Sequence, residues 1–167
     1  MEEVNKQMRR LFIVRKDLNL SPGKMSAQLM HCAEAYWTRM MKRSIFGIYK
    51  ENKDEIGFSS CDENGNDSVS GYHLEMLIDA DTMENYICGT FTKTVCAAKN
   101  KNHLMNAVEK AKELGLVENE DFGLIYDKCL TELTPEEEDG TTLTCIWFKP
   151  LLDEKAHYIS KKYQLYK

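Results

Sequence analysis

The order of apolar and polar positions in the first 40 residues predicts a strand followed by a helix. Residues 11–14 form a short, β-prone apolar run that ends at a polar Arg15-Lys16-Asp17 segment, which is typical of a buried strand. Ser21 and Pro22 then supply a helix N-cap and a proline at the first helical position. The segment that follows carries apolar residues at the 3.6-residue period of an amphipathic helix, namely Met25, Leu29, Cys32, Ala33, Tyr36 and Met40.

Similar patterns recur along the rest of the chain and indicate its fold class. Apolar runs predict strands over 91–98, 122–126 and 143–148, and helical periodicity predicts helices from Asn102 to Gly115 and over 151–162. Between residues 43 and 90 the pattern is weaker and favours a loop over 62–68, a strand over 72–78 and a short helix over 80–87. Because strands alternate with helices, we expect the α/β class, as a single three-layer α/β/α domain over 1–167 with a mixed, mostly parallel sheet of about four strands.

The charge of the chain changes this picture through its distribution. The 167 residues carry a net charge of −5 and a pI of about 5.4, which by itself argues against a nucleic-acid partner. Two segments hold this negative charge, however: residues 51–90 carry −9 and residues 118–140 carry −8. The remaining residues together carry +12. We interpret the acidic segments as solvated loops, which leaves a basic remainder that can face an anion.

Neither the cysteines nor the apolar runs indicate export or a membrane. No apolar run approaches the length needed to span a bilayer, and the start of the sequence has no apolar targeting core. The cysteines are scattered without a C-x-x-C pair, so neither a zinc site nor a dense disulfide framework is expected. We therefore predict a cytoplasmic protein with no membrane partner. The six cysteines are Cys32, Cys61, Cys88, Cys96, Cys129 and Cys145.

Candidate chemistry lies where predicted strands end and helices begin, because α/β folds form their sites at that edge. Gly23-Lys24 at a helix start is not a nucleotide-binding P-loop, since Leu18 and Met25 occupy the positions that need glycine and serine or threonine. Two interpretations of Lys24 stay open: a cation for an oxyanion or phosphate beside a helix N-terminus, or a solvated lysine. Asp127 ends a predicted strand, where a turn-capping aspartate is the commoner case.

Three blocks of the sequence together resemble one family, the second type of peptidyl-tRNA hydrolase. The first block is 11–32, with Arg15-Lys16-Asp17-Leu18, Gly23-Lys24 and Ala27-Gln28-Leu29-Met30-His31-Cys32. The second is 111–116, and the third runs from Asp127 through Thr131 and Thr144 to Pro150. The end of the chain, 163–166, resembles the family's terminal strand. The resemblance covers residues 9–40 and 88–167, with the blocks in the family's order.

The sequence departs from the family pattern at three places. Residues 43–87 form an acidic insertion that is longer than the family's usual link. Lys128-Cys129 replaces the Ala-Gly that follows the family's site aspartate, and glycine there permits backbone angles that cysteine resists. Residues 135–140 lengthen the next loop, so Thr142 is an alternative to Thr144 as the residue that matches the family's last site threonine.

The resemblance implies hydrolysis of the ester between a peptide and the 3′ ribose of tRNA, without a metal or other cofactor. It places the catalytic residues at Lys24, Gln28, Asp127, Thr131 and Thr144. We expect the substrate, peptidyl-tRNA, to be bound with the help of His31, Arg10, Arg15 and Lys16, and its phosphates also by Arg9, Lys99 and Lys101. Family members are often dimers, so a homodimer is one option.

Two alternatives remain open at the level of sequence. The altered Lys128-Cys129 loop and the acidic insertion are compatible with a non-catalytic module that binds RNA or protein and retains the hydrolase fold. A hydrolase of another acyl ester is the second alternative. The joint presence of Lys24, Gln28, Asp127 and Thr131 favours the enzyme, because a pure binding module has no evident need for all four.

Overall fold

The structure is a computed structural model that describes residues 7–51, 57–61, 67–72 and 76–167. It divides into two compact units, one made of residues 1–36 and 79–167 and the other of residues 37–78. The first unit contains the predicted strand–helix elements and the candidate site. No helix within the described residues has the length and apolar character to cross a membrane.

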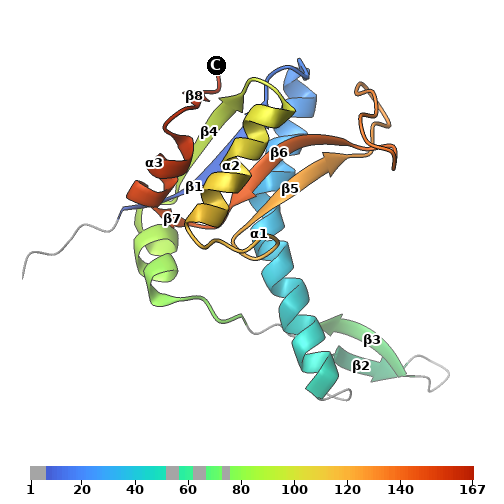
Figure 1. Cartoon of the computed structure of the whole chain (residues 1–167). Coiled ribbons are helices and arrows are strands. Elements are labelled where there is room, and N and C mark those ends of the chain that lie inside the picture. Colours follow the sequence, from blue (N-terminus) through green and yellow to red (C-terminus); the bar gives the residue numbers. More distant parts are fainter. Residues whose placement is uncertain (1–6, 52–56, 62–66, 73–75) are drawn as a thin grey trace, which may run out of the picture. The chain divides into compact units, whose positions relative to one another are not determined.

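A six-stranded sheet organises the first unit (Figure 1). Its order is β5-β6-β1-β4-β8, and β7 also pairs with β1. The strands are β1 (Met8–Arg15), β4 (Thr92–Ala98), β5 (Phe122–Asp127), β6 (Thr142–Phe148), β7 (Leu151–Leu152) and β8 (Gln164–Leu165). The helices are α1 (Pro22–Glu51), η1 (Thr82–Thr90), which is a π-helix, α2 (Lys101–Glu113) and α3 (Asp153–Ser160). The α/β class is confirmed.

The predicted strand directions need correction, because only β1 and β4 pair in parallel and every other pair is antiparallel. Parallel neighbours need a crossover connection, usually a helix. No helix separates β5 from β6, and only Lys149 and Pro150 separate β6 from β7. The sheet is therefore mixed but mostly antiparallel, and it has six strands where about four were predicted.

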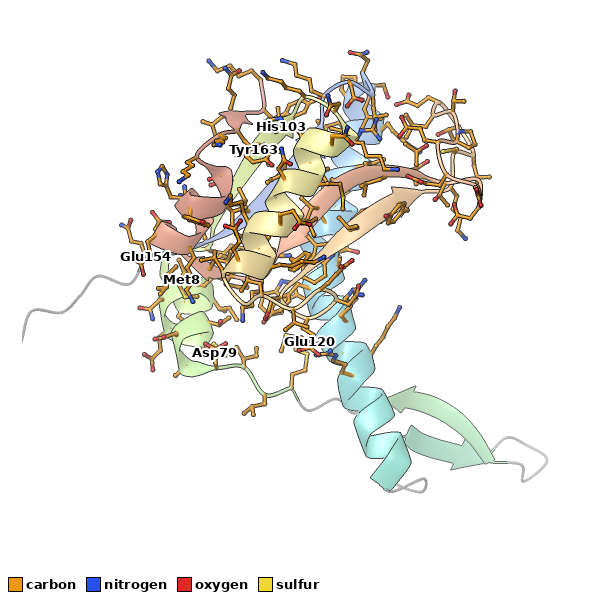
Figure 2. All side chains as sticks on the ribbon, viewed as in Figure 1. Met8, Asp79, His103, Glu120, Glu154 and Tyr163 are labelled. Atoms are coloured by element: carbon orange, nitrogen blue, oxygen red, sulfur yellow. The ribbon has the colours of Figure 1, made fainter. Side chains whose placement is uncertain are left out.

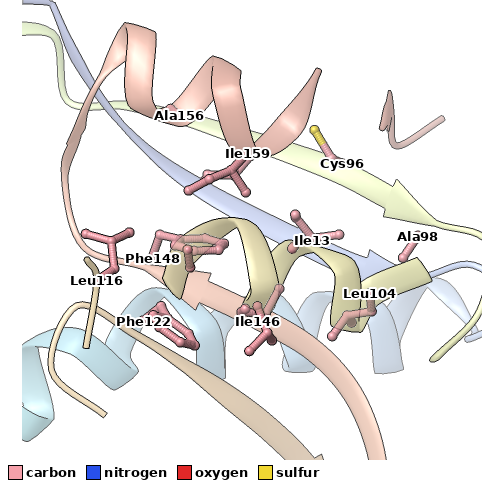
Figure 3. Close-up of a cluster of buried hydrophobic side chains, with 14 of the residues drawn as sticks. Ile13, Cys96, Ala98, Leu104, Leu116, Phe122, Ile146, Phe148, Ala156 and Ile159 are labelled. Atoms are coloured by element: carbon pink, nitrogen blue, oxygen red, sulfur yellow. The ribbon is translucent and has the colours of Figure 1, made fainter. Parts of the chain in front are cut away.

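The two faces of the sheet are covered by different helices, as expected for three layers. Leu11 and Ile13 of β1 belong to a buried cluster that includes side chains of α2 and α3, such as Leu104 and Ile159 (Figure 3). Side chains alternate across a strand, so the intervening β1 residues face the first turns of α1. Because β1 is covered on both sides, its apolar run is continuous rather than alternating.

Arg10 connects α1 to the sheet from within the protein. Its side chain is 1% exposed, and its guanidinium donates to the backbone oxygens of Cys32 and Ala33 in α1 and of Phe148 in β6. The guanidinium also lies 5.0 Å from the centre of the Phe12 ring. A buried polar group is tolerated when it is hydrogen-bonded, so Arg10 holds the helix against the strands.

Strand directions bring the predicted site residues to one edge of the sheet. β6 runs opposite to β1, and β5 runs opposite to β6, so β5 points the same way as β1 and β4. Arg15, Ala98 and Asp127 thus end their strands at the same edge, where α1 and α2 also begin. This is the edge at which open α/β sheets form their sites.

The second unit contains the end of α1 and the antiparallel strands β2 (Gly57–Cys61) and β3 (Asp67–Tyr72). Of the loop predicted over 62–68, residues 62–66 lie outside the described residues, and Asp67 and Ser68 belong to β3. The strand predicted over 72–78 is wrong at 76–78, which are not in a strand, and residues 73–75 lie outside the described residues. The short helix predicted over 80–87 corresponds to η1. The single-domain assignment stays a prediction.

We expect a Gly123→Ala variant to be destabilised by about 1–3 kcal/mol, the usual effect of overpacking. Gly123 of β5 pairs with Trp147 of β6, and a Cβ atom at Gly123 would meet Trp147 ring atoms at 2.8 Å. Trp147 is fully buried and cannot move aside. Urea denaturation measures the effect, with Gly23→Ala as the control because nothing lies within 4 Å of a Cβ there. Equal stability of the two variants would contradict this packing.

Candidate active site

The N-terminus of α1 places Lys24 beside the end of β5. Ser21 caps the helix, because its Oγ accepts a hydrogen bond from the Lys24 backbone N–H at 3.3 Å. The Lys24 side chain then extends from the first turn toward Asp127, and Nζ lies 2.7 Å from Asp127 Oδ2. Nζ also donates to Thr131 Oγ1 at 3.1 Å. Three of the predicted catalytic residues therefore meet at one ammonium group.

Gln28 joins this group to β6 through a buried amide. Its side chain is 1% exposed, and Nε2 donates to Asp127 Oδ2 at 2.7 Å. Thr144 Oγ1 lies 2.7 Å from Gln28 Oε1 and donates to it. The direction of the amide follows from chemistry, since an ionised carboxylate only accepts and must face the NH₂ group. All five predicted catalytic residues thus belong to one hydrogen-bonded network.

A β-bulge aims Thr144 at Gln28. Ile125 pairs with Cys145 and Tyr126 pairs with Leu143, so Thr144 is the extra residue in β6. As a result two successive side chains face α1: Thr144 contacts the Gln28 amide, and Cys145 Sγ lies 3.7 Å from the Gln28 backbone oxygen. The alternative, Thr142, instead donates to the backbone oxygen of Thr134 at 2.8 Å. Thr144, and not Thr142, joins the network.

Asp127 is also the first residue of a tight turn. Its Oδ1 accepts from the Cys129 backbone N–H at 2.8 Å, the pattern of an Asx-turn. Cys129 adopts the left-handed region with φ of 55°, a conformation that costs a non-glycine residue roughly 1–2 kcal/mol. Cysteine resists these backbone angles, as expected from the replacement of a glycine. Cys129 nevertheless adopts them, and its hydrogen bond to Asp127 offsets part of the strain.

The surroundings of Asp127 have opposing effects on its pKa. Burial acts to raise the pKa of the Asp127 carboxyl, but hydrogen bonds from Lys24, from the Cys129 N–H and from Gln28, together with the charge of Lys24, hold it below its usual value. The carboxylate is thus ionised at neutral pH and is a weak base. It fixes the positions of the Lys24 ammonium and the Gln28 amide.

Sequence reasoning missed the contact between Ser21 and Glu132. Glu132 Oε1 accepts from both the backbone N–H and the hydroxyl of Ser21, at 3.0 and 3.1 Å. This contact ties the 128–134 loop to the helix start and so helps to hold Thr131 near Lys24. A glutamate directly after Thr131 carries no local signal of this partner, which lies 111 residues earlier in the chain.

The residues expected to bind substrate lie outside this network. Arg15 is 3% exposed and pairs with Asp17 and Glu136, and the Glu136 hydrogen bond raises the pKa of Arg15. Arg10 is buried beneath α1. Lys16 is exposed at the end of β1, and His31 is exposed on α1. The structure therefore leaves Lys16 and His31 open to a ligand and occupies both arginines with protein partners.

The network can stabilise negative charge and orient a small polar molecule. An ammonium has three N–H bonds, of which Asp127 and Thr131 take two, so one stays available for a substrate oxygen. Its charge acts with the positive end of the α1 dipole. In the part of the chain that the structure describes, no three His, Cys, Asp or Glu side chains are grouped so that they could hold a metal ion.

We expect the pKa of Asp127 to rise in a Lys24→Met variant, because burial persists while the strongest hydrogen bond and the nearby charge are lost. Carboxyl ¹³C NMR titration measures it, and Lys128→Met, in the adjacent loop, is the control. In the wild type this pKa lies below that of an unfolded aspartate, about 3.9. Its stabilising contribution is therefore complete above that pH and is lost as pH falls through the folded pKa. An unchanged Asp127 pKa would contradict the Lys24 contact.

Comparisons with known proteins place the chain in one family. No curated protein matches the chain. Among solved structures, a protein of unknown function from Agrobacterium tumefaciens strain C58 is similar at 13% identity and a TM-score of 0.42, and the match covers 96% of this chain and 98% of that one. Residues 8–166 match the family model described as peptidyl-tRNA hydrolase PTH2. Because this match covers nearly the whole chain, the protein belongs to the peptidyl-tRNA hydrolase PTH2 family.

Proposed function

We propose that this protein hydrolyses the ester bond between the peptide and the tRNA of peptidyl-tRNA, and that Lys24, Asp127, Thr131, Gln28 and Thr144 carry the reaction. The observation that carries the proposal is the Lys24 ammonium, which Asp127 and Thr131 hold at 2.7 and 3.1 Å with one N–H bond left over. Membership of the family supports the same activity.

The reaction requires stabilisation of an oxyanion. The oxygen of a water molecule attacks the ester carbonyl carbon, and negative charge develops on the carbonyl oxygen. The bond from that carbon to the ribose 3′ oxygen then breaks, and the 3′ oxygen takes up the proton that the water releases. The products are the peptide carboxylate, with the second water proton released to solvent, and tRNA with a free 3′ hydroxyl. Lys24 supplies the positive charge that stabilises the developing oxyanion.

Asp127 acts mainly by position in this scheme. Its lowered pKa makes it a poor acceptor for a proton from water. Its negative charge pairs with the Lys24 ammonium and points it in one direction. Thr131 is exposed, so its hydroxyl is available to the water or to the ribose hydroxyls.

Gln28 and Thr144 act one step further from the substrate. Both side chains are buried. Gln28 contacts Asp127, and Thr144 contacts Gln28. We assign them the role of positioning residues that hold the Asp127 carboxylate against Lys24.

We also propose that the protein acts in the cytoplasm. The cysteines whose side chains the structure describes, which are Cys32, Cys88, Cys96, Cys129 and Cys145, are all free thiols. A reducing compartment keeps thiols in that state. The homodimer stays a prediction.

We expect Lys24→Ala and Asp127→Asn to lower kcat for peptidyl-tRNA by about 10²–10³, the usual effect of losing one electrostatic group in a hydrolytic site. Release of labelled peptide from peptidyl-tRNA measures the rate. Lys128→Ala is the matched control, because it removes the same charge from an exposed residue beside Asp127. Thermal unfolding of all variants separates lost chemistry from lost folding.

Two outcomes would decide against the proposal. A wild-type protein that binds peptidyl-tRNA without releasing peptide would favour the non-catalytic binding module. A Lys24→Ala variant as active as Lys128→Ala would remove Lys24 from the reaction.

We expect hydrolysis to continue at an unchanged rate when a chelator is present, because the proposed charge stabilisation comes from Lys24. The assay compares initial rates before and after dialysis against EDTA, with added Mg²⁺ as a separate arm, since Mg²⁺ also affects tRNA folding. A loss of activity that Zn²⁺ or Mn²⁺ restores and Mg²⁺ does not would show a metal-dependent reaction.

A further inference from the structure

Four lysines line a cleft at the end of the parallel strand pair. The cleft has a volume of about 600 Å³ and is lined by Lys16, Lys99, Lys162 and Lys167, with His103 and Gln164 among its other residues. All four lysines are exposed, and no aspartate or glutamate of the described residues lines the cleft. We call this feature the lysine cleft.

Within the part of the chain that the structure describes, the lysines of the cleft differ from their neighbours in having no carboxylate partner. Among the residues that the structure describes, none of the four forms an ion pair, whereas Arg15, next to Lys16, pairs with Asp17 and Glu136. Lys101, two residues after Lys99, pairs with Glu137. The acidic segment 118–140 thus neutralises cations on either side of the cleft without neutralising the cleft itself.

The cleft lies at the same sheet edge as Lys24 and Asp127. Lys16 follows β1 and Lys99 follows β4, and the Lys16 backbone N–H donates to Ala98 O at 2.8 Å. The site lies where β5 ends and α1 begins, at the edge that β1 and β4 share. A ligand that extends along this edge can therefore reach both.

His103 forms a rigid part of the cleft wall. Its ring stacks on Tyr163 with centres 4.3 Å apart, and its Nδ1 accepts from the Lys99 backbone N–H at 3.0 Å. Figure 2 shows His103 and Tyr163 side by side between the start of α2 and the end of the chain. Since Nδ1 accepts, a neutral His103 carries its proton on Nε2 and offers a hydrogen-bond donor.

We propose that the lysine cleft binds the sugar-phosphate backbone of the tRNA part of the substrate while the ester occupies the Lys24 site. This inference rests on the proposed function. A set of unpaired, exposed ammonium groups without a carboxylate suits a polyanion with repeated charges, and phosphate contacts of this kind position a nucleic acid without reading its sequence. The buried Arg10 and Arg15 cannot supply these contacts.

The test compares two triple variants of equal net charge. The cleft variant is Lys16→Gln, Lys99→Gln and Lys162→Gln. The control is Lys93→Gln, Lys112→Gln and Lys155→Gln, which changes three exposed lysines outside the cleft. Fluorescence anisotropy measures the Kd of each full-length protein for a deacylated tRNA across a range of NaCl concentrations.

We expect the salt dependence of tRNA binding to become weaker in the cleft variant. The magnitude of the slope of log Kd against log salt concentration should decrease by about 2–3, since each phosphate contact contributes about 0.7–0.9 to it. The Kd at low salt should rise about ten- to hundredfold, and the control should stay close to the wild type. On peptidyl-tRNA the cleft variant should show a higher KM with little change in kcat. Circular dichroism checks that both variants fold.

Each contrary result has a distinct meaning. Equal slopes for the cleft variant and the control would overturn the lysine cleft as the phosphate-binding surface, even if the wild type hydrolyses peptidyl-tRNA. If the cleft variant lost as much affinity for polyglutamate of the same length as it loses for tRNA, the assignment to RNA would be overturned. A wild-type protein that binds tRNA through the cleft but releases no peptide would leave the cleft in place and overturn the proposed function instead.

Discussion

The buried amide of Gln28 fixes the geometry on which the candidate site depends. A buried amide that lost either partner would leave a donor or an acceptor unsatisfied, at a cost of about 1–3 kcal/mol. Gln28 meets this constraint with Asp127 at one end and Thr144 at the other. The bulge in β6, the Asx-turn at Asp127 and the position of α1 must all agree with these two contacts. Lys24, one helical turn before Gln28, then reaches the same Asp127 oxygen.

Arginine and lysine have different uses in this protein. Arg10 and Arg15 are almost fully buried, and each makes several directional hydrogen bonds that join distant segments. The planar guanidinium suits this structural role, whereas a lysine ammonium is a compact, strongly hydrated charge on a flexible stem. Exposed lysines are therefore better placed to meet a solvated polyanion. Arg10 and Arg15 hold the fold together. The lysines Lys99, Lys162 and Lys167 instead face solvent.

Several carboxylates of the acidic segment 118–140 make specific contacts within the protein, which its net charge of −8 alone does not indicate. Asp127 lies inside the site, and Glu132 accepts hydrogen bonds from Ser21 at the start of α1. Glu136 pairs with Arg15, and Glu137 pairs with Lys101. Asp127, Glu136 and Glu137 are thus partners of specific cations, and Glu132 is the partner of Ser21, so these carboxylates do not form a general negative field. An acidic net charge is for this reason compatible with a basic surface at the sheet edge. Our interpretation of this segment as a solvated loop holds only for part of it.

The sequence by itself determined the α/β class, the start of α1 at Pro22, the boundaries of most strands and helices of the first unit and, through the family resemblance, a set of residues that the fold joins in one network. These features are encoded locally, in hydrophobic period, capping residues and motif spacing. The strand directions, the choice of Thr144 over Thr142 and the burial of Arg10 and Arg15 were decided only by the tertiary structure. Alternation alone does not choose between Thr142 and Thr144. The pairing with β5 creates the bulge that brings Thr144 to Gln28, while Thr142 donates to Thr134. Likewise, the local sequence around an arginine within or after an apolar strand does not show what the arginine will contact. The partner can be solvent, a ligand or a backbone oxygen more than 100 residues away, and it is brought near only once the chain has folded.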